Sequence, residues 1–268
     1  DSALLTAIPF FILLGEILVR AGIARRTYEA LDAWAAWAPG GLVHANIGTA
    51  TLFSATSGSS VATAATVATV AMPQAERLNY DPRLFAGSIA AGGTLGIMIP
   101  PSINLIVYGF LTETSVPRLF LAGLVPGLMM ALMFMGITAI LCSLYPNLGG
   151  PRRKAPWSLR WRSLLELVPI GILFGSVVGT IYAGLATPTE AAAIGVAMAF
   201  AIAASRRSLT LKGISDALIG TIRITAMIMF IILGAYVLNF ALAASGLGSA
   251  LSQFLDTLGL SPFGTLLA

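Results

Sequence analysis

The segment "GGTLGIMIPPS" at residues 92–102 places glycines and a proline pair around a strongly apolar centre. Glycine weakens a helix and proline lacks the backbone N–H, so the segment predicts an interruption of helical structure. The chain on either side is as apolar as a helix that faces lipid. Inside a bilayer, non-helical backbone is tolerated only where protein buries it or where it lines a polar cavity. The segment therefore indicates a buried or functional break in a membrane helix.

The composition places the whole chain in a membrane. Of its 268 residues, 57% are hydrophobic and 10% are charged, and the mean hydropathy is +0.90. A soluble domain carries about 25% charged residues, so most of this chain should form spanning helices. The start at Asp1 and the apolar end indicate an internal fragment of a longer protein. We attribute the net charge of +4 to cationic cytoplasmic loops, not to nucleic-acid binding.

Several kinds of site are excluded by the residues that the sequence lacks. Cys142 is the single cysteine, so neither a disulfide framework nor a cysteine metal cluster is expected. No phosphate-binding loop occurs, so the sequence does not support transport driven by ATP. We expect no cofactor apart from a coupling ion.

Apolar runs predict the order of the elements. Residues 3–20 form a first span, and residues 23–38 form an amphipathic helix with aromatic anchors that lies in the membrane interface. Further apolar segments follow at residues 42–72, 84–111, 118–145, 163–184, 188–204 and 217–243, and another element begins at residue 247. Polar loops are expected at residues 73–83, 146–162 and 205–212. The predicted fold class is an all-α polytopic membrane protein.

Basic residues orient these segments. The loop at residues 146–162 carries five Lys or Arg residues and the loop at 205–212 carries three, so both should be cytoplasmic. Counting back from them, residues 42–72 begin and end on the cytoplasmic side. The first arm, residues 42–56, is about 22 Å long as a helix, which is too short for a hydrocarbon core of ~30 Å. We therefore prefer a re-entrant hairpin with its tip at residues 57–60 over two full spans.

The hairpin tip and the interrupted segment should bring backbone and hydroxyl oxygens to a similar depth. Such oxygens suit a hard monovalent cation, and the N-termini of half-helices suit an anion. We predict an ion or substrate site formed by Ser57, Gly58, Ser59, Ser60, Gly92, Gly93, Thr94, Gly96, Pro100, Pro101, Ser102 and Asn104. The alternative is that these small residues serve only tight helix packing.

Three motifs then resemble a known family. They are "ATSGSSVATAATVATVAMP" (55–73), "AAGGTLGIMIPPSINLIVYG" (90–109) and "GLATPTEAAAIGV" (184–196). In order and spacing, they closely resemble the large membrane subunit of tripartite ATP-independent periplasmic (TRAP) transporters, over essentially the whole chain. The resemblance implies an elevator-type fold of two inverted repeats, each with a re-entrant hairpin and a discontinuous helix. The second hairpin and its broken helix would follow residue 268.

The resemblance also implies a function and a domain plan. It implies Na⁺-coupled import of a carboxylate, such as a C4-dicarboxylate, with Na⁺ near Ser57, Ser59, Thr94 and Gly96. A periplasmic solute-binding protein and a small four-helix membrane subunit would be the partners, in the lipid of a bacterial or archaeal inner membrane. Residues 1–41 would hold the first span and the interfacial helix, and residues 42–111 the transport-domain hairpin and broken helix. Residues 112–268 would hold connecting spans, scaffold helices and the start of the second repeat.

Two alternative functions remain beside this interpretation, and one further motif has two possible roles. One is a Na⁺-coupled organic-anion carrier that needs no binding protein. Another is an intramembrane serine hydrolase that pairs His44 with Ser57 or Ser59, but the topology puts His44 near the cytoplasmic face and the serines at mid-depth. In "ATPTEA" (186–191), Thr187 and Glu190 form a predicted capping box, with a role in gating or ion binding as the alternative.

Overall fold

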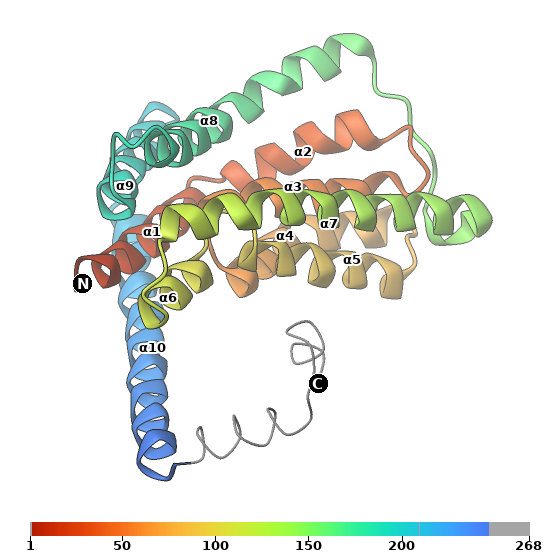
Figure 1. Ribbon diagram of the computed structural model, residues 1–268. Helices are drawn as coiled ribbons and strands as arrows, with labels where there is room; N and C mark the ends of the chain where they lie inside the picture. Colours follow the sequence, from red (N-terminus) through yellow and green to blue (C-terminus); the bar gives the residue numbers. More distant parts are fainter. Residues whose placement is uncertain (1, 209, 247–268) are drawn as a thin grey trace. The chain divides into compact units, whose positions relative to one another are not determined.

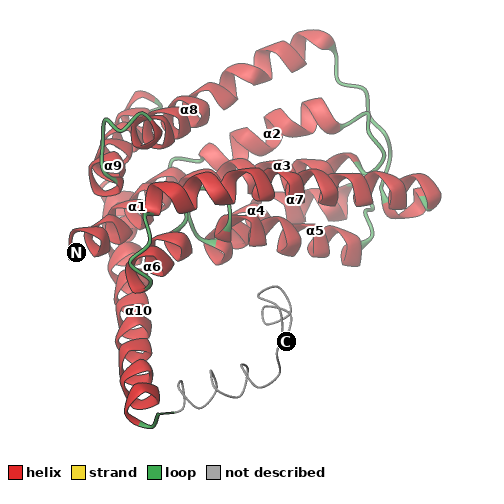
Figure 2. Ribbon diagram, in the orientation of Figure 1, coloured by secondary structure: helices red, strands yellow, loops and turns green. Residues whose placement is uncertain are grey.

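The computed structural model describes residues 2–208 and 210–246, and all regular secondary structure within these ranges is helical (Figure 2). The chain divides into two compact units, Asp1–Ile222 and Arg223–Ala268. The α-helices are α1 (Ser2–Arg20), α2 (Ile23–Ala35), α3 (Gly41–Ser57), α4 (Ser60–Arg77), α5 (Pro82–Thr94), α6 (Ile103–Leu111), α7 (Val116–Leu144), α8 (Trp157–Tyr182), α9 (Pro188–Ser205) and α10 (Leu211–Ala244). Two 3₁₀ turns are η1 (Leu95–Ile97) and η2 (Pro146–Leu148). The element predicted from residue 247 lies outside the described residues.

Four helices within the described residues are long and apolar enough to cross a membrane: α7, α8, α9 and α10. The pair α1 and α2 adds a fifth span if the two bent helices are counted together. The hairpin helices α3 and α4 are not in this set, in agreement with the prediction that neither arm crosses alone. The prediction of an all-α, multi-pass membrane protein is confirmed, whereas the re-entrant placement stays a prediction.

The predicted boundaries are wrong at three polar loops. Helix α4 continues through Pro73 to Arg77, so most of the loop expected at residues 73–83 is helical. Membrane helices tolerate an internal proline because nearby groups satisfy the freed carbonyl. Helix α8 begins at Trp157 and α10 begins at Leu211, both inside segments expected to be loops. In each case the polar residues lie in the terminal turns of a helix and not in a loop.

A sharp bend separates α1 from α2. The two helices meet at 67°, and Gly22 between them has a positive φ of 69°. This bend confirms a distinct amphipathic helix after the first span. The helix ends at Ala35, three residues before the predicted end. It is not a solitary surface helix, because it packs against α3 on one side and α8 on the other (Figure 1).

Helix α3 is central to the packing of the first unit, with α2, α4, α5 and α7 as neighbours (Figure 1). Its residues are almost all buried, including Phe53. Small residues bring the neighbouring helices close. Membrane helices need this close contact because they associate through packing and not through the hydrophobic effect. For example, a Cβ atom at Gly15 of α1 would lie 2.9 Å from Ser57 Cα, and one at Gly195 of α9 would lie 2.7 Å from Leu14 Cδ1.

The base of the hairpin is closed by the segment between α7 and α8. The Asp81 N–H donates to Leu148 O at 3.3 Å, and the Arg153 N–H donates to Ala36 O at 2.8 Å. Beside them, the buried Tyr80 hydroxyl accepts a hydrogen bond from the Leu42 N–H at 3.1 Å, which satisfies an open donor at the start of α3. Burial raises the pKa of the Tyr80 hydroxyl.

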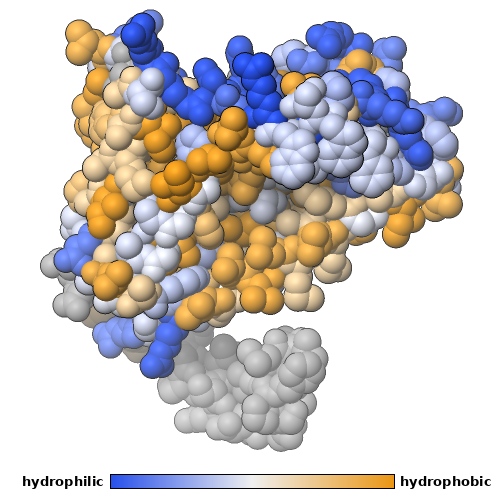
Figure 3. Space-filling model, turned by 90° about the horizontal axis from the view of Figure 1, so that it is seen from above, coloured by the Kyte–Doolittle hydropathy of each residue, from blue (hydrophilic) through white to orange (hydrophobic). Residues whose placement is uncertain are grey.

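Hydrophilic side chains gather along one edge of the face seen in Figure 3, and hydrophobic side chains cover most of the rest of that face. Exposed apolar residues are frequent on α7 and α8, for example Leu132 at 67% and Leu165 at 66% exposure. A bilayer or a partner helix, and not water, is the natural surrounding of such surfaces.

Candidate ion and substrate site

The hairpin tip consists of two residues between two helices. Helix α3 ends at Ser57, and Gly58 follows with a φ of +62°. The Gly58 N–H donates to Ser54 O at 3.0 Å and closes the last turn. Ser59 is extended, and its hydroxyl accepts from the Ala62 N–H at 3.4 Å at the start of α4. The predicted tip at residues 57–60 is therefore where the structure turns.

A buried hydroxyl pair spans the tip. Ser57 Oγ lies 2.8 Å from Thr63 Oγ1, and both side chains are buried, with 3% and 0% of their surface exposed. The same Ser57 hydroxyl also lies 3.5 Å from the Ser59 carbonyl oxygen. The tip thus holds hydroxyl and carbonyl oxygens close together; the Ser57 and Thr63 hydroxyls are buried, where electrostatic interactions are stronger than in water, and Ser59 is partly buried.

The discontinuous helix is confirmed, but its break begins later than predicted. Helix α5 continues through Gly92 and Gly93 to Thr94, η1 follows, and the backbone is non-helical at residues 98–102 before α6 begins. Ser102 closes the break, because its hydroxyl donates to Ile97 O at 2.7 Å and accepts from the Leu105 N–H at 3.4 Å. Pro100 and Pro101 lie within the break and are both buried.

The tip and the break contact each other directly. The Ile103 N–H at the start of α6 donates to Gly58 O at 3.1 Å. A Cβ atom at position 58 would lie 2.8 Å from Pro101 O, and one at Gly96 would lie 3.0 Å from Ser60 N. Only glycine permits backbone to approach backbone this closely. Two segments about 40 residues apart in the sequence therefore form one structure.

Gly92 and Gly93 place α5 between the two arms of the hairpin. A Cβ atom at Gly92 would lie 2.8 Å from Ala50 Cβ of α3, and one at Gly93 would lie 2.7 Å from Ala64 Cβ of α4. Consecutive helical residues point about 100° apart, so these two glycines fit against different helices. In this structure both glycines serve helix packing, and a direct role in binding stays a prediction.

Two predicted site residues are not at the contact between tip and break. Thr94 is exposed, and its hydroxyl donates to Ala91 O at 2.6 Å within its own helix. Since Gly93 faces α4, the next residue turns away from the hairpin. Asn104 is likewise exposed, on the first turn of α6. The placement of Na⁺ near Thr94 and the role of Asn104 remain predictions.

Several buried polar side chains of α3 were missed by the sequence reasoning. Ser54 is fully buried and its hydroxyl has no hydrogen-bond partner within the described residues. Asn46 is also fully buried; its amide nitrogen donates to Ser88 Oγ at 2.9 Å, but its oxygen has no partner there. An unpartnered buried polar atom costs about 1–3 kcal/mol, which makes Ser54 a candidate ligand. The signal was its spacing of three residues from Ser57, on one helix face.

The oxygen atoms around the tip fit a hard monovalent cation. Among the described residues, no group of three or more His, Cys, Asp and Glu side chains could hold a transition metal. The donors at the tip are hydroxyls and carbonyls, with Ser54 Oγ open to a further bond. Neutral oxygen ligands of this kind suit Na⁺, and a Na⁺ site at Ser57 and Ser59 stays a prediction, to which the unpartnered Ser54 hydroxyl adds a candidate ligand.

The turn between α8 and α9 forms the predicted capping box. The Thr187 N–H donates to Glu190 Oε2 at 2.8 Å, and the Glu190 N–H donates to Thr187 Oγ1 at 3.3 Å. Both side chains are exposed. The bonds of this turn are satisfied locally, so the capping role is confirmed, and a role in gating or ion binding stays a prediction.

His44 lies at the opposite end of α3 from the tip serines. Its Nε2 atom is 2.8 Å from Pro39 O, in the first turn of the helix. Thirteen residues separate it from Ser57, which corresponds to about 20 Å along a helix. A general base must lie within hydrogen-bond reach of its nucleophile, so this geometry argues against a serine hydrolase.

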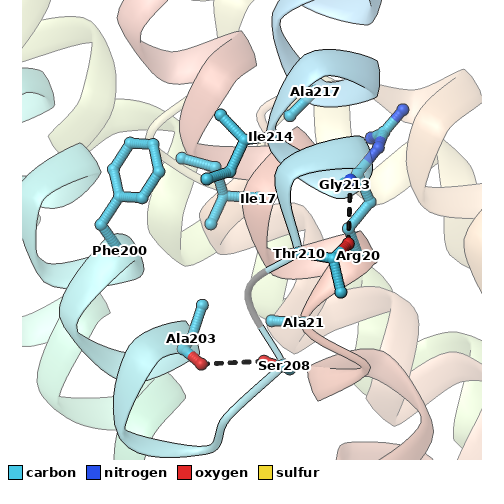
Figure 4. Close-up of a pocket in the computed structure, with 10 residues that line it drawn as sticks. All are labelled: Ile17, Arg20, Ala21, Phe200, Ala203, Ser208, Thr210, Gly213, Ile214 and Ala217. Atoms are coloured by element: carbon cyan, nitrogen blue, oxygen red, sulfur yellow. Dashed lines mark hydrogen bonds between the residues drawn. The ribbon is translucent and has the colours of Figure 1, made fainter.

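A small cavity elsewhere in the first unit contains none of the predicted site residues. Its volume is about 20 Å³, and it lies among α1, α9 and the start of α10 (Figure 4). Its walls are mainly apolar, with Ile17, Phe200 and Ile214 facing inward. Nearby, the Ser208 hydroxyl donates to Ala203 O at 3.0 Å. A space of this size holds about one water molecule, so it is a packing defect and not a substrate site.

Comparison with known proteins identifies relatives along the whole chain. The family described as "Tripartite ATP-independent periplasmic transporter, DctM component" matches residues 1–268. The chain is 37% identical to the C4-dicarboxylate TRAP transporter large permease protein DctM of Pseudomonas aeruginosa, over 98% of this chain and 61% of the relative. It is 34% identical to the 2,3-diketo-L-gulonate TRAP transporter large permease protein YiaN of Escherichia coli, over 98% and 61%.

A third relative is the sialic acid TRAP transporter large permease protein SiaM of Vibrio cholerae, which is 31% identical over 100% of this chain and 62% of the relative. The chain thus spans about three fifths of the length of the curated relatives that it matches.

Proposed function

This chain belongs to the DctM component family of tripartite ATP-independent periplasmic transporters, a family of transporter permeases and not of enzymes, and we propose that it works in Na⁺-coupled uptake of a carboxylate. The observation that carries the proposal is the direct contact between the hairpin tip and the helix break. The hydrogen bond from the Ile103 N–H to Gly58 O and the close fit of Gly96 against Ser60 join these segments.

The proposed substrate class is a small organic acid. The relatives are named for C4-dicarboxylates, for sialic acid and for 2,3-diketo-L-gulonate, all of which carry a carboxylate. The N-termini of α4 and α6 both begin at the contact between tip and break. Helix N-termini present open N–H donors and a partial positive charge, which favour a carboxylate nearby.

The proposed ion site is the set of oxygens at the tip. Ser57 and Ser54 contribute buried hydroxyls, and Ser59 contributes a carbonyl. With a cation bound among them, residues 57–60 would be held in one arrangement against residues 98–102. This coupling would make substrate binding depend on Na⁺, because the carboxylate meets helix N-termini that the same arrangement positions. The hairpin and broken helix would then move together relative to the other helices, as in an elevator.

The proposed partners follow from the family. A periplasmic solute-binding protein would deliver the carboxylate, and a small membrane subunit would complete the transporter in the bacterial inner membrane. The chain itself contributes the apolar outer surfaces of α7 and α8 that a membrane subunit or lipid could cover.

The test is uptake of labelled carboxylates into proteoliposomes that contain the full-length protein, its small membrane subunit and its binding protein. We expect uptake under an inward Na⁺ gradient and near-background uptake when K⁺ replaces Na⁺. Unchanged uptake without Na⁺ would disprove the coupling. Uptake that proceeds equally well without the binding protein would instead favour the simpler Na⁺-coupled carrier.

A further inference from the structure

A charged groove lies between α2 and α8, away from the hairpin tip. The two helices run antiparallel (Figure 1). Arg26 meets Glu166 near one end of the pair, and Trp34 meets Trp157 near the other. The groove has a volume of about 570 Å³. Its walls are Arg25, Arg26, Glu29, Ala30 and Ala33 of α2 and Leu159, Arg162, Ser163 and Glu166 of α8.

The groove carries a surplus of positive charge. Glu166 is neutralised by Arg206 at 2.7 Å and by Arg26 at 3.4 Å. Arg25 and Arg162 form no ion pair among the described residues, and Glu29 is the remaining acid of the lining. With Arg206 included, four guanidinium groups face two carboxylates. A guanidinium binds phosphate with two parallel hydrogen bonds, so the groove favours a phosphate group.

Aromatic residues mark the depth of this groove in the membrane. The rings of Trp157 and Trp161 pack edge-on against Trp34, with centroids 6.4 Å and 6.1 Å away. Trp34 is fixed in place, because its Nε1–H donates to Arg160 O at 3.1 Å. Trp157 and Trp161 nonetheless remain 64% and 63% exposed. Exposed tryptophans beside arginines are typical of the level of lipid head groups.

An apolar stripe on α8 leads away from the groove toward the membrane interior. Trp161, Leu165, Val168 and Ile172 recur at helical spacing, and each is at least 46% exposed. Arg162, one residue after Trp161, lies about a quarter-turn round the helix. A molecule with a phosphate in the groove could therefore lay a hydrocarbon chain along this stripe.

We propose that the groove between α2 and α8 binds the head group of an anionic phospholipid of the cytoplasmic leaflet. Arg25 and Arg162 bind the phosphodiester, Glu29 accepts from head-group hydroxyls, and an acyl chain covers Leu165 and Ile172. The phosphate chemistry alone would equally suit a soluble phosphate. The continuous apolar stripe favours the lipid, since a free anion has no use for it. The basic loops before α8 and after α9 set the cytoplasmic side.

The experiment is a lipid titration of the purified full-length transporter, with its small membrane subunit, followed by native mass spectrometry. Phosphatidylglycerol is the probe and phosphatidylcholine the reference. We expect Arg162→Gln to weaken retention of phosphatidylglycerol about fivefold and Arg25→Gln/Arg162→Gln to weaken it further. The matched control is Arg152→Gln, which removes the same charge from an exposed residue outside the groove. Elution profiles of the variants check that they fold.

Four outcomes would overturn the proposal. If phosphatidylcholine bound as well as phosphatidylglycerol, the groove would not select anionic lipids. An equal loss of phosphatidylglycerol in Arg152→Gln and Arg162→Gln would show that the overall positive charge, and not the groove, retains the lipid. Competition by soluble glycerophosphate at the same concentration would assign the groove to a free anion, and binding seen only without the small membrane subunit would assign it to that subunit.

Discussion

Two helix–helix turns of this chain use the same local device in different surroundings. Ser59 is the N-cap of α4 at the hairpin tip, and Thr187 is the N-cap of α9 at the turn after α8; both cap with a hydroxyl. At the Thr187 turn, the cap is completed by Glu190 at 2.8 Å and both residues are exposed. At the tip, Gly58 O accepts its hydrogen bond from Ile103, which belongs to another segment.

The difference separates a structural turn from a candidate binding site. The turn at Thr187 completes its cap within four residues, through the reciprocal hydrogen bonds between Thr187 and Glu190. The tip leaves Ser54 Oγ without a partner, although it is fully buried. Buried polar atoms in native proteins are nearly always bonded, so the unpartnered Ser54 hydroxyl, three residues before the tip, keeps this end of α3 a candidate binding site.

The largest effect is expected for Gly58→Ala. Alanine at a φ of +62° is strained, and its Cβ atom would lie 2.8 Å from Pro101 O. Strain of about 1–3 kcal/mol at the contact should lower uptake at least tenfold in proteoliposomes. Gly87→Ala is the matched control, because position 87 in α5 has open space around it. Normal uptake by Gly58→Ala would show that the contact with the break is dispensable.

Gly96→Ala should have a smaller effect on the same contact. Its Cβ atom would lie 3.0 Å from Ser59 C and Ser60 N, which are backbone atoms that cannot rotate away. A displacement of a few tenths of an ångström should raise the Na⁺ concentration for half-maximal uptake by several-fold. Gly171→Ala in α8, where no atom lies within 4 Å, should leave it unchanged. If Gly96→Ala and Gly171→Ala had the same Na⁺ dependence, the fit of Gly96 against the hairpin tip would not influence Na⁺ binding.

Ser57→Ala tests the hydroxyl itself. It removes the contact with Thr63 Oγ1 at 2.8 Å and one proposed ion ligand. We expect a several-fold rise in the half-saturating Na⁺ concentration, measured by uptake at saturating carboxylate. Ser57→Thr, which keeps the hydroxyl, should recover part of the affinity. If the alanine variant retained its Na⁺ dependence while losing stability, the pair with Thr63 would be structural only.

The smallest effect is expected for Thr187→Ala. Loss of an N-cap weakens a helix modestly, so the melting temperature of the purified protein should fall by about 2–4 °C. The half-saturating Na⁺ concentration should stay at the wild-type value. A clear shift in Na⁺ dependence would show that the two turns are functionally alike, and the comparison between them would fail.

The sequence predicted the tip and the break because both depend on local chemistry. Serine and glycine at residues 57–60 and the adjacent prolines at 100 and 101 disfavour a continuous helix through local effects on the backbone. The start of the break was predicted too early, at Gly92, because glycine in a helix is tolerated when packing favours it. Gly92 against Ala50 and Gly93 against Ala64 provide that packing.

The orientation of side chains could not be read from the motif. Thr94 was predicted near Na⁺ from its place in the motif, but its hydroxyl bonds Ala91 O on an exposed face. Ser54 was not predicted, although it lies on the helix face of Ser57 and is fully buried. Whether a hydroxyl in a helix meets its own carbonyl or a distant segment depends on the neighbours of that helix.

The sequence by itself determined that this chain is a helical membrane protein, because hydropathy and helix-breaking residues act over short distances. It also determined the helix boundaries to within about six residues, and that Thr187 and Glu190 form a cap. Only the tertiary structure decided that Gly58 meets Ile103 and that Gly96 fits against Ser60. These contacts join residues about 40 positions apart, and their geometry depends on how α5 packs between both arms of the hairpin.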